Sequence, residues 1–326
     1  MRQHWQLISI DNQRTTGPLG QLDEFFWNPT SVMPQLQAPV VPSIYKLNTT
    51  TNLEDRGKAE RTALELQPSM LLLALPVELL LIIAEDLGKD YLDLLCFSLT
   101  CTFLWEITGQ SRYRSLCCKL ENESWAGSRI LLVGDFAVTL PKSMLTDIET
   151  DELGLDESNN ALYRVALDSF QVFGSTDSLI MGHPRVQTNS NLRRELLDAN
   201  HNTQLKPWIS FHWKDFTPIQ EHGDHWMLRN LLQREYVSLA RPDNITQALY
   251  SLTATRTTHS NLSMFAGLDW LAEGPWAGDR IDHTLVSIHR QEHGDGGDWK
   301  DITPDVMQDL EALAIYTGHE GELYLV

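Results

Sequence analysis

The sequence predicts a mixed α+β protein, in which an N-terminal helical module is followed by a domain built on a mixed, mainly antiparallel sheet. Two strongly apolar helical segments lie between residues 75 and 105, an apolar run of strand length covers 129–136, and an amphipathic helix covers 303–316. Strands and helices alternate irregularly after residue 124, unlike the regular strand–helix order of parallel sheets. We therefore expect three regions, namely a disordered or loosely docked leader (1–62), a helical module (63–122) and an α+β domain (123–326).

Composition indicates a folded protein that does not bind nucleic acid. The chain has 326 residues, of which 42% are hydrophobic and ten are tryptophan, and its formal net charge is −19. A polyanion requires a basic patch, whereas Lys and Arg are scattered along this chain without a run. We expect neutral or basic protein surfaces as partners.

Cysteine usage and hydropathy predict a reducing compartment, cytoplasmic or nuclear. The four cysteines at positions 96, 101, 117 and 118 have neither zinc spacing nor the spread of a disulfide framework. The first residues have no sustained apolar stretch that would make a secretory signal. Pro76 and Glu78 interrupt the apolar run 70–84, which is shorter than the roughly 20 residues that span a membrane. We predict no membrane association.

The leader is rich in proline and threonine and sustains neither a helical nor a strand period. The adjacent aromatics Phe25, Phe26 and Trp27 are the exception, and they are expected to anchor on the folded body.

The helical module is predicted from its own start and stop signals. Pro76 suits the first position of a helix, and Glu78 lies at the positive end of the helix dipole. Gly88 ends this helix, and a second one is expected over 92–105. Both helices are apolar over more of their circumference than a helix pair buries against itself. The pattern favours a docking partner, with a buried helical hairpin inside one large domain as the alternative.

The same stretch resembles the F-box. The resemblance rests on Leu75-Pro76-x-Glu78-Leu79, then Asp93-Leu94-Leu95, then Cys101-x-x-Leu104-Trp105. Members of that family fold as a small helical module that docks on the Skp-type linker of a cullin–RING ubiquitin ligase. The resemblance implies that Glu78 supports the helix start, that Trp105 closes the module, and that the linker is contacted by Leu75, Pro76, Leu79, Ile82, Leu94, Leu95 and Leu99.

The second half of the chain contains an internal echo. The segment Trp125-Ala126-Gly127-Ser128-Arg129-Ile130 recurs as Trp276-Ala277-Gly278-Asp279-Arg280-Ile281, and each copy leads into an expected strand. We interpret the copies as equivalent structural corners on neighbouring strands, with Trp125 and Trp276 in the core and Arg129 and Arg280 paired locally. A shared binding site for two like groups is the alternative.

A second resemblance covers residues 70–326 in outline. The F-box followed by Ser124-Trp125-Ala126-Gly127-x-Arg129, by 228–231 with 234–237, and by Gly274-Pro275-Trp276-Ala277-Gly278-Asp279-Arg280 is similar to F-box proteins common in mushroom-forming fungi. That family has no well-defined catalytic residues. The resemblance implies an adaptor that selects a target protein for ubiquitination, while other subunits do the chemistry.

Catalytic chemistry is not predicted. His289-Arg290-Gln291-Glu292-His293 fits the letters of an inverted zinc-peptidase motif, which requires a helix, but a strand is expected over 281–289 and a turn after it. Phosphate-loop, dinucleotide and nucleophile-elbow patterns are lacking, so we predict no metal and no cofactor. Two alternatives stay open: an F-box protein that acts outside a ligase, and an enzyme housed in residues 124–326.

Overall fold

The computed structural model divides into two compact units. It describes residues 3–27, 32–40, 72, 75–135, 137, 140, 144–155, 162–172, 189–200, 224–239, 242–255, 274–294 and 298–317. One unit, the sheet domain, is formed by Met1–Ala38 together with Ser124–Val326, and the other, the helical unit, by Pro39–Glu123. The helical unit is therefore inserted in the sequence of the sheet domain.

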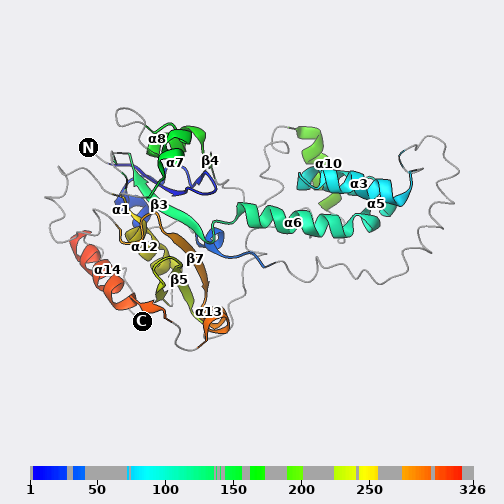
Figure 1. The fold of residues 1–326 in the computed structure, drawn as a ribbon. Helices are drawn as coiled ribbons and strands as arrows, with labels where there is room; N and C mark the ends of the chain where they lie inside the picture. Colours follow the sequence, from blue (N-terminus) through cyan, green and yellow to red (C-terminus); the bar gives the residue numbers. More distant parts are fainter. Residues whose placement is uncertain are drawn as a thin grey trace. The chain divides into compact units, whose positions relative to one another are not determined.

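The described part of the sheet domain contains an 8-stranded sheet in the order β4-β2-β1-β3-β7-β5-β6-β8. Its central strands β3, β7 and β5 are labelled in Figure 1. The β2–β4 and β6–β8 pairs are parallel and the other pairs are antiparallel. The predicted fold class is thus confirmed. The strands are β1 (Trp5–Ser9), β2 (Arg14–Thr15), β3 (Ser128–Gly134), β4 (Gln171–Val172), β5 (Trp226–Asn230), β6 (Glu235–Leu239), β7 (Arg280–Leu285) and β8 (Lys300–Asp301).

The two halves of this sheet repeat one another, β1 to β4 corresponding to β5 to β8. Trp5 pairs with Gly134 on β3, and Trp226 pairs with Leu285 at the matching position of β7. Both hairpins turn through a residue with positive φ, Gln13 in the first half and Arg234 in the second. The backbone oxygens of these two residues accept hydrogen bonds from β4 and from the N–H that begins β8, respectively. The sheet is therefore two copies of one unit, joined between β3 and β7.

The repeated Trp-Ala-Gly-x-Arg corners lie at this junction, on neighbouring strands as expected. In each corner the Trp oxygen accepts from the N–H three residues later, and the third residue, Gly127 or Gly278, has φ of +73° or +80°. This is the arrangement of a type II turn, whose third position favours glycine. The Gly127 N–H donates to the Ile281 oxygen at 2.8 Å, and the Gly278 N–H donates reciprocally to the Ile130 oxygen at 3.0 Å.

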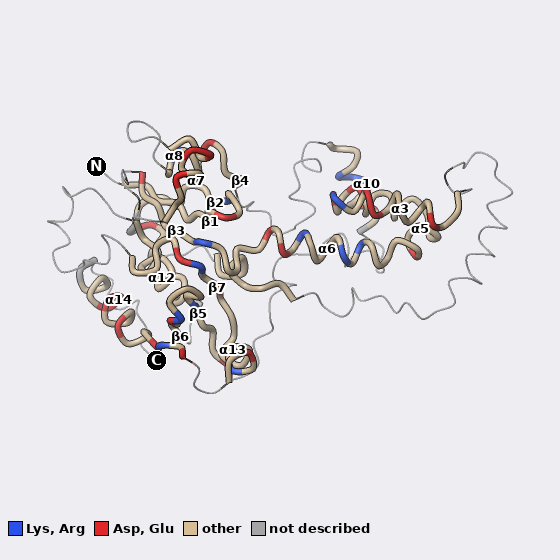
Figure 2. Tube along the Cα trace, in the orientation of Figure 1, with Lys and Arg blue, Asp and Glu red and all other residues tan. Residues whose placement is uncertain are grey.

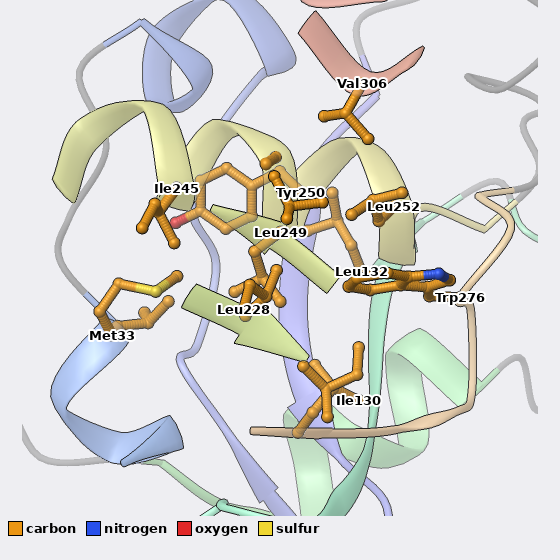
Figure 3. Packing of buried hydrophobic residues seen from close by; sticks show 14 of the residues in the cluster. Met33, Ile130, Leu132, Leu228, Ile245, Leu249, Tyr250, Leu252, Trp276 and Val306 are labelled. Atoms are coloured by element: carbon orange, nitrogen blue, oxygen red, sulfur yellow. The ribbon is translucent and has the colours of Figure 1, made fainter. Parts of the chain in front are cut away.

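One face of the sheet carries the main core, which both halves share. Leu7 projects into it from β1, and Trp125 is fully buried there. Leu132 of β3, Leu228 of β5 and the fully buried Trp276 belong to the same core (Figure 3). Helices α12 (Pro242–Thr253) and α14 (Thr303–Thr317) cover this face because each has an apolar stripe at helical spacing. The charged residues of α14 are all acidic (Figure 2).

The opposite face differs between the halves. In the first half Ile8 and Leu131, both fully buried, pack with α8 (Leu162–Ser169) in a second apolar cluster. The other described helical segments of the sheet domain are α1 (Leu22–Phe26), η1 (Met33–Leu36), α7 (Asp147–Glu152), α10 (Ser190–Asn200) and α13 (Val286–His293).

The helical unit contains α3 (Val77–Leu87), α4 (Tyr91–Ser98), α5 (Thr102–Ile107) and α6 (Gly109–Glu123). Leu80, Phe103 and Leu104 form its buried centre, against which Val77 and Phe97 pack. Asp90 caps α4 by accepting from the Leu92 N–H at 2.8 Å. Along α6 the basic residues come first and the acidic residues lie near its C-terminal end (Figure 2).

The predicted leader is wrong for residues 3–27 and 32–38. Strand β1 lies between β2 and β3, and all five of its residues are buried. A strand buried on both faces lacks the alternation by which a half-exposed strand is recognised. The expected anchoring of the aromatics is confirmed by Phe25 and Phe26, which are 3% and 1% exposed. Residues 41–71 lie outside the described residues, and they include residues 63–71 of the predicted helical module.

Two predicted boundaries are also wrong. The helix expected over 92–105 is two helices, because the Ser98 and Thr100 hydroxyls bond to nearby backbone oxygens and Cys101 is extended. The strand expected over 281–289 ends at Leu285, where α13 begins. Helix α7 starts with a capping box formed by Thr146 and Glu149.

No helix in the described ranges has the length and apolar character needed to cross a membrane.

Candidate functional site

The outer face of α3 is the candidate docking site. Leu80 and Ala84 are the two buried residues of this helix, and they point into the helical unit. On the other side Leu79 is 45% exposed and Ile82 is 60% exposed. Pro76 continues this line one turn earlier and is also exposed. Large apolar side chains gathered in this way typically mark an interaction surface.

The start of α3 fixes this face. Pro76 precedes the helix with ψ of 147°, and its oxygen accepts from the N–H groups of Leu79 and Leu80 at 3.1 and 3.2 Å. Glu78 is exposed in the first turn, where a negative charge is favourable. Pro76 is therefore the N-cap and not the first helical residue that the sequence predicts, while Glu78 lies in the first turn as expected.

The structure divides the seven expected contact residues into three groups. Pro76, Leu79 and Ile82 are exposed, and Leu75 and Leu99 are partly buried. Leu94 and Leu95 are each 0% exposed, so their assignment as contacts is wrong. Helical spacing placed them on apolar sides of α4, but those sides pack inside the helical unit, where α4 meets α3 and α6.

Trp105 belongs to the interior joint between α5 and α6. The guanidinium carbon of Arg112 lies 3.3 Å from the centroid of the Trp105 ring, and Nη1 of Arg112 donates to the Trp105 backbone oxygen at 2.8 Å. Burial lowers the pKa of Arg112 to about 9, so the cation over the ring persists at neutral pH. This contact is consistent with the predicted closing role of Trp105.

The two corner arginines form a charge cluster at the junction of the halves. Arg129 and Arg280 lie directly opposite each other on β3 and β7, an arrangement of like charges that is unfavourable without a counter-ion. Asp11 supplies it, at 2.7 Å from Arg129 and 3.2 Å from Arg280. Glu149 adds a second carboxylate at 2.5 Å from Arg129. These carboxylates and the burial of both tryptophans favour the structural interpretation of the corners over a binding site.

A second polar cluster, which the sequence interpretation missed, lies on the second half of the sheet. Arg229 of β5 is 5% exposed and makes a bidentate ion pair with Asp282, its cross-strand neighbour, at 2.8 and 2.7 Å. Its Nη1 also donates to Glu292 at 2.8 Å and contacts Nδ1 of His289 at 3.1 Å. We call these four residues the Arg229 cluster.

The Arg229 cluster changes the interpretation of the His289–His293 segment. The segment lies on helix α13 and not at the end of a strand, so the stated reason against a zinc motif is wrong. Glu292 is nevertheless bonded to Arg229, and no three His, Cys, Asp or Glu residues converge as a metal site in the described part of the chain.

Two sequence signals point to the cluster. The pairs His4-Trp5 and His225-Trp226 mark the start of the two equivalent hairpins. Aligning them places Arg229 at the position of Ile8, and aligning the corners places Asp282 at the position of Leu131. An apolar pair in one copy thus corresponds to an ion pair in the other.

Comparisons with protein-family models, with curated proteins and with solved structures find no match for this chain.

Proposed function

We propose that the protein is an F-box adaptor that docks on a Skp-type linker through the exposed face of α3. The observation that carries the proposal is the line formed by Pro76, Leu79 and Ile82, whose side chains face away from the centre of the helical unit. The resemblance of residues 75–105 to the F-box identifies the kind of partner. In this role the sheet domain presents a target to a cullin–RING ubiquitin ligase, and other subunits supply the chemistry.

The physical driving force is burial of this apolar line. Fully burying a leucine or isoleucine side chain contributes about 1.5–3 kcal/mol, and such anchors at the centre of an interface carry most of its binding energy. Leu94 and Leu95 have a different role, since they hold α4 against the rest of the helical unit. A charge at either of these two positions would unfold the module and would say nothing about docking.

The test is co-purification of the full chain with a Skp-type linker. Leu79→Asp combined with Ile82→Asp places two charges in the contact, and each is expected to weaken binding by at least about tenfold. Both positions are exposed, so circular dichroism and the melting temperature should stay at their wild-type values. Leu232→Asp is the matched control, because Leu232 is 69% exposed and lies in the sheet domain.

Retention of the linker by the double variant at the wild-type level would refute the proposal. If wild-type protein binds the linker but does not recruit a cullin–RING ligase, the alternative of an F-box protein that acts outside a ligase holds instead.

A further inference from the structure

The Arg229 cluster stands where the other copy of the same unit has an apolar core. At the equivalent positions the first half has Ile8 and Leu131, both fully buried beneath α8. The fold can therefore have apolar side chains at these two positions. A buried ion pair is generally no more stabilising than well-packed apolar residues. Stability therefore does not explain why the second half has Arg229 and Asp282 at these positions.

The contact between Arg229 and His289 fixes the protonation state of the histidine. A guanidinium only donates hydrogen bonds, so the Nδ1 atom 3.1 Å from Nη1 of Arg229 must be an unprotonated acceptor. Protonation would place a hydrogen on Nδ1, opposite another donor. The hydrogen bond would be replaced by repulsion between two cations at a site where His289 is 8% exposed.

Charged groups and aromatic rings surround His289 on the sheet, on its own helix and on the segment that follows the helix. Arg229 and Asp282 face it from the sheet, Glu292 comes from its own helix, and the rings in contact are those of Tyr236, His293 and Trp299. Burial lowers the pKa of His289, and the positive charges of Arg229 and His293 lower it further, while Glu292 and Asp282 act in the opposite direction.

We propose that His289, Arg229 and Glu292 form an acid-sensitive latch that holds helix α13 on the sheet, and that protonation of His289 releases the helix. The helix follows directly from Leu285 and ends at Gly294, whose φ of +76° suits a glycine. Release uncovers Ile288, which packs against the main core, together with the rings of Tyr236 and Trp299. The latch thus makes an apolar surface available below a threshold pH.

The direction of the pH dependence follows from the two states of the latch. The imidazole takes up a proton less readily when latched than when exposed, so acid favours the released state. The stabilising effect of the latch is complete above the ordinary histidine pKa of 6.5 and is lost as the pH falls below it. Each unit of separation between the two pKa values changes the equilibrium of release by about tenfold.

Hydrogen exchange of the full chain, followed by mass spectrometry from pH 7.5 to pH 5.0 and corrected for intrinsic rates, tests the latch. Protection of 286–293 should fall by about tenfold or more across this range, while β3 keeps its protection. In His289→Gln the amide oxygen replaces Nδ1 as an acceptor and does not titrate, so protection of α13 should become independent of pH. The matched control His293→Gln, one turn later on the same helix, should still lose protection in acid, by less than wild type because the charge of His293 no longer lowers the pKa of His289.

A second measurement uses the wild-type protein alone. The side-chain nitrogen shifts of His289 at pH 7.5 should identify the tautomer with its proton on Nε2. A proton on Nδ1, an α13 that stays protected at pH 5.0, or an acid response that persists in folded His289→Gln would each overturn the proposal.

Discussion

The two halves of the sheet have one backbone plan and two different interiors. Their strand registers coincide residue by residue, and their corners donate the same reciprocal hydrogen bonds across the junction. On the face opposite the main core, the first half carries an apolar cluster covered by α8. On the same face the second half carries a buried arginine bonded to two carboxylates and a histidine. Turn chemistry and strand register therefore specify this unit, whereas the packing on its outer face is free to change between apolar and ionic.

The largest effects are expected where the halves agree. Trp125→Ala and Trp276→Ala each remove a fully buried side chain of the main core, which costs about 3–5 kcal/mol. Both variants should lower the melting temperature markedly, and by similar amounts, and should leave the proposed docking of the helical unit on a Skp-type linker unchanged. Variants that keep full thermal stability but lose target binding would make the corners a recognition site.

The next effect separates the ionic interior from the apolar one. Arg229→Ile alone leaves the Asp282 carboxylate without its partner and should destabilise the protein by about 3–5 kcal/mol. Asp282→Leu alone should cost less, because Arg229 keeps its bond to Glu292. The double variant copies the first half into the second, and it should be neutral or more stable by about 1–4 kcal/mol than wild type. Denaturant unfolding of the three variants measures these differences. A double variant as unstable as the single ones would mean that the cluster is structural.

The smallest effects are expected at the junction charges. Arg280 is 55% exposed, so Arg280→Ala should cost less than about 1 kcal/mol, and Arg129→Ala more, because Arg129 is bonded to both Asp11 and Glu149.

Arg129 also leaves a titration signature. Its hydrogen bond lowers the pKa of Glu149 to about 2. The stabilising contribution of that carboxylate is therefore present above its ordinary pKa of 4.5 and is lost as the pH falls towards 2. In Arg129→Gln the pKa of Glu149 should rise towards 4.5, as measured by carboxyl carbon shifts. An unchanged pKa would show that the capping bonds from Thr146 alone set it.

Elements that carry their own pattern were predictable from the sequence. The strand at 129–136, the helix at 303–316 and the start of α3 each show a local period or cap, and the repeated corners revealed that two strands are neighbours. Strand β1 has no such signal, because its residues are buried on both faces and its partner β3 lies far along the chain. The Arg229 cluster depends on cross-strand register, which no single segment specifies.

Exposure was predictable only in part. Helical spacing shows that α3 and α4 each have apolar sides in excess, but it does not distinguish the side that meets another helix from the side that meets solvent. Leu79 and Leu94 have the same local pattern, and only the packing of four helices places one outside and the other inside.

The insertion of the helical unit between η1 and β3 dictates an order of events during synthesis. Leu7 of β1 pairs with Leu132, whereas Leu228 of β5 pairs with His283. At about 5–20 residues per second, β1 waits for roughly 125 further residues and β5 for only about 55, so the first apolar strand emerges many seconds before its partner. The helical unit, made of local contacts, is complete within that interval and folds first. Chaperone dependence should therefore concentrate on the first half of the sheet, even though the two halves reach the same final register.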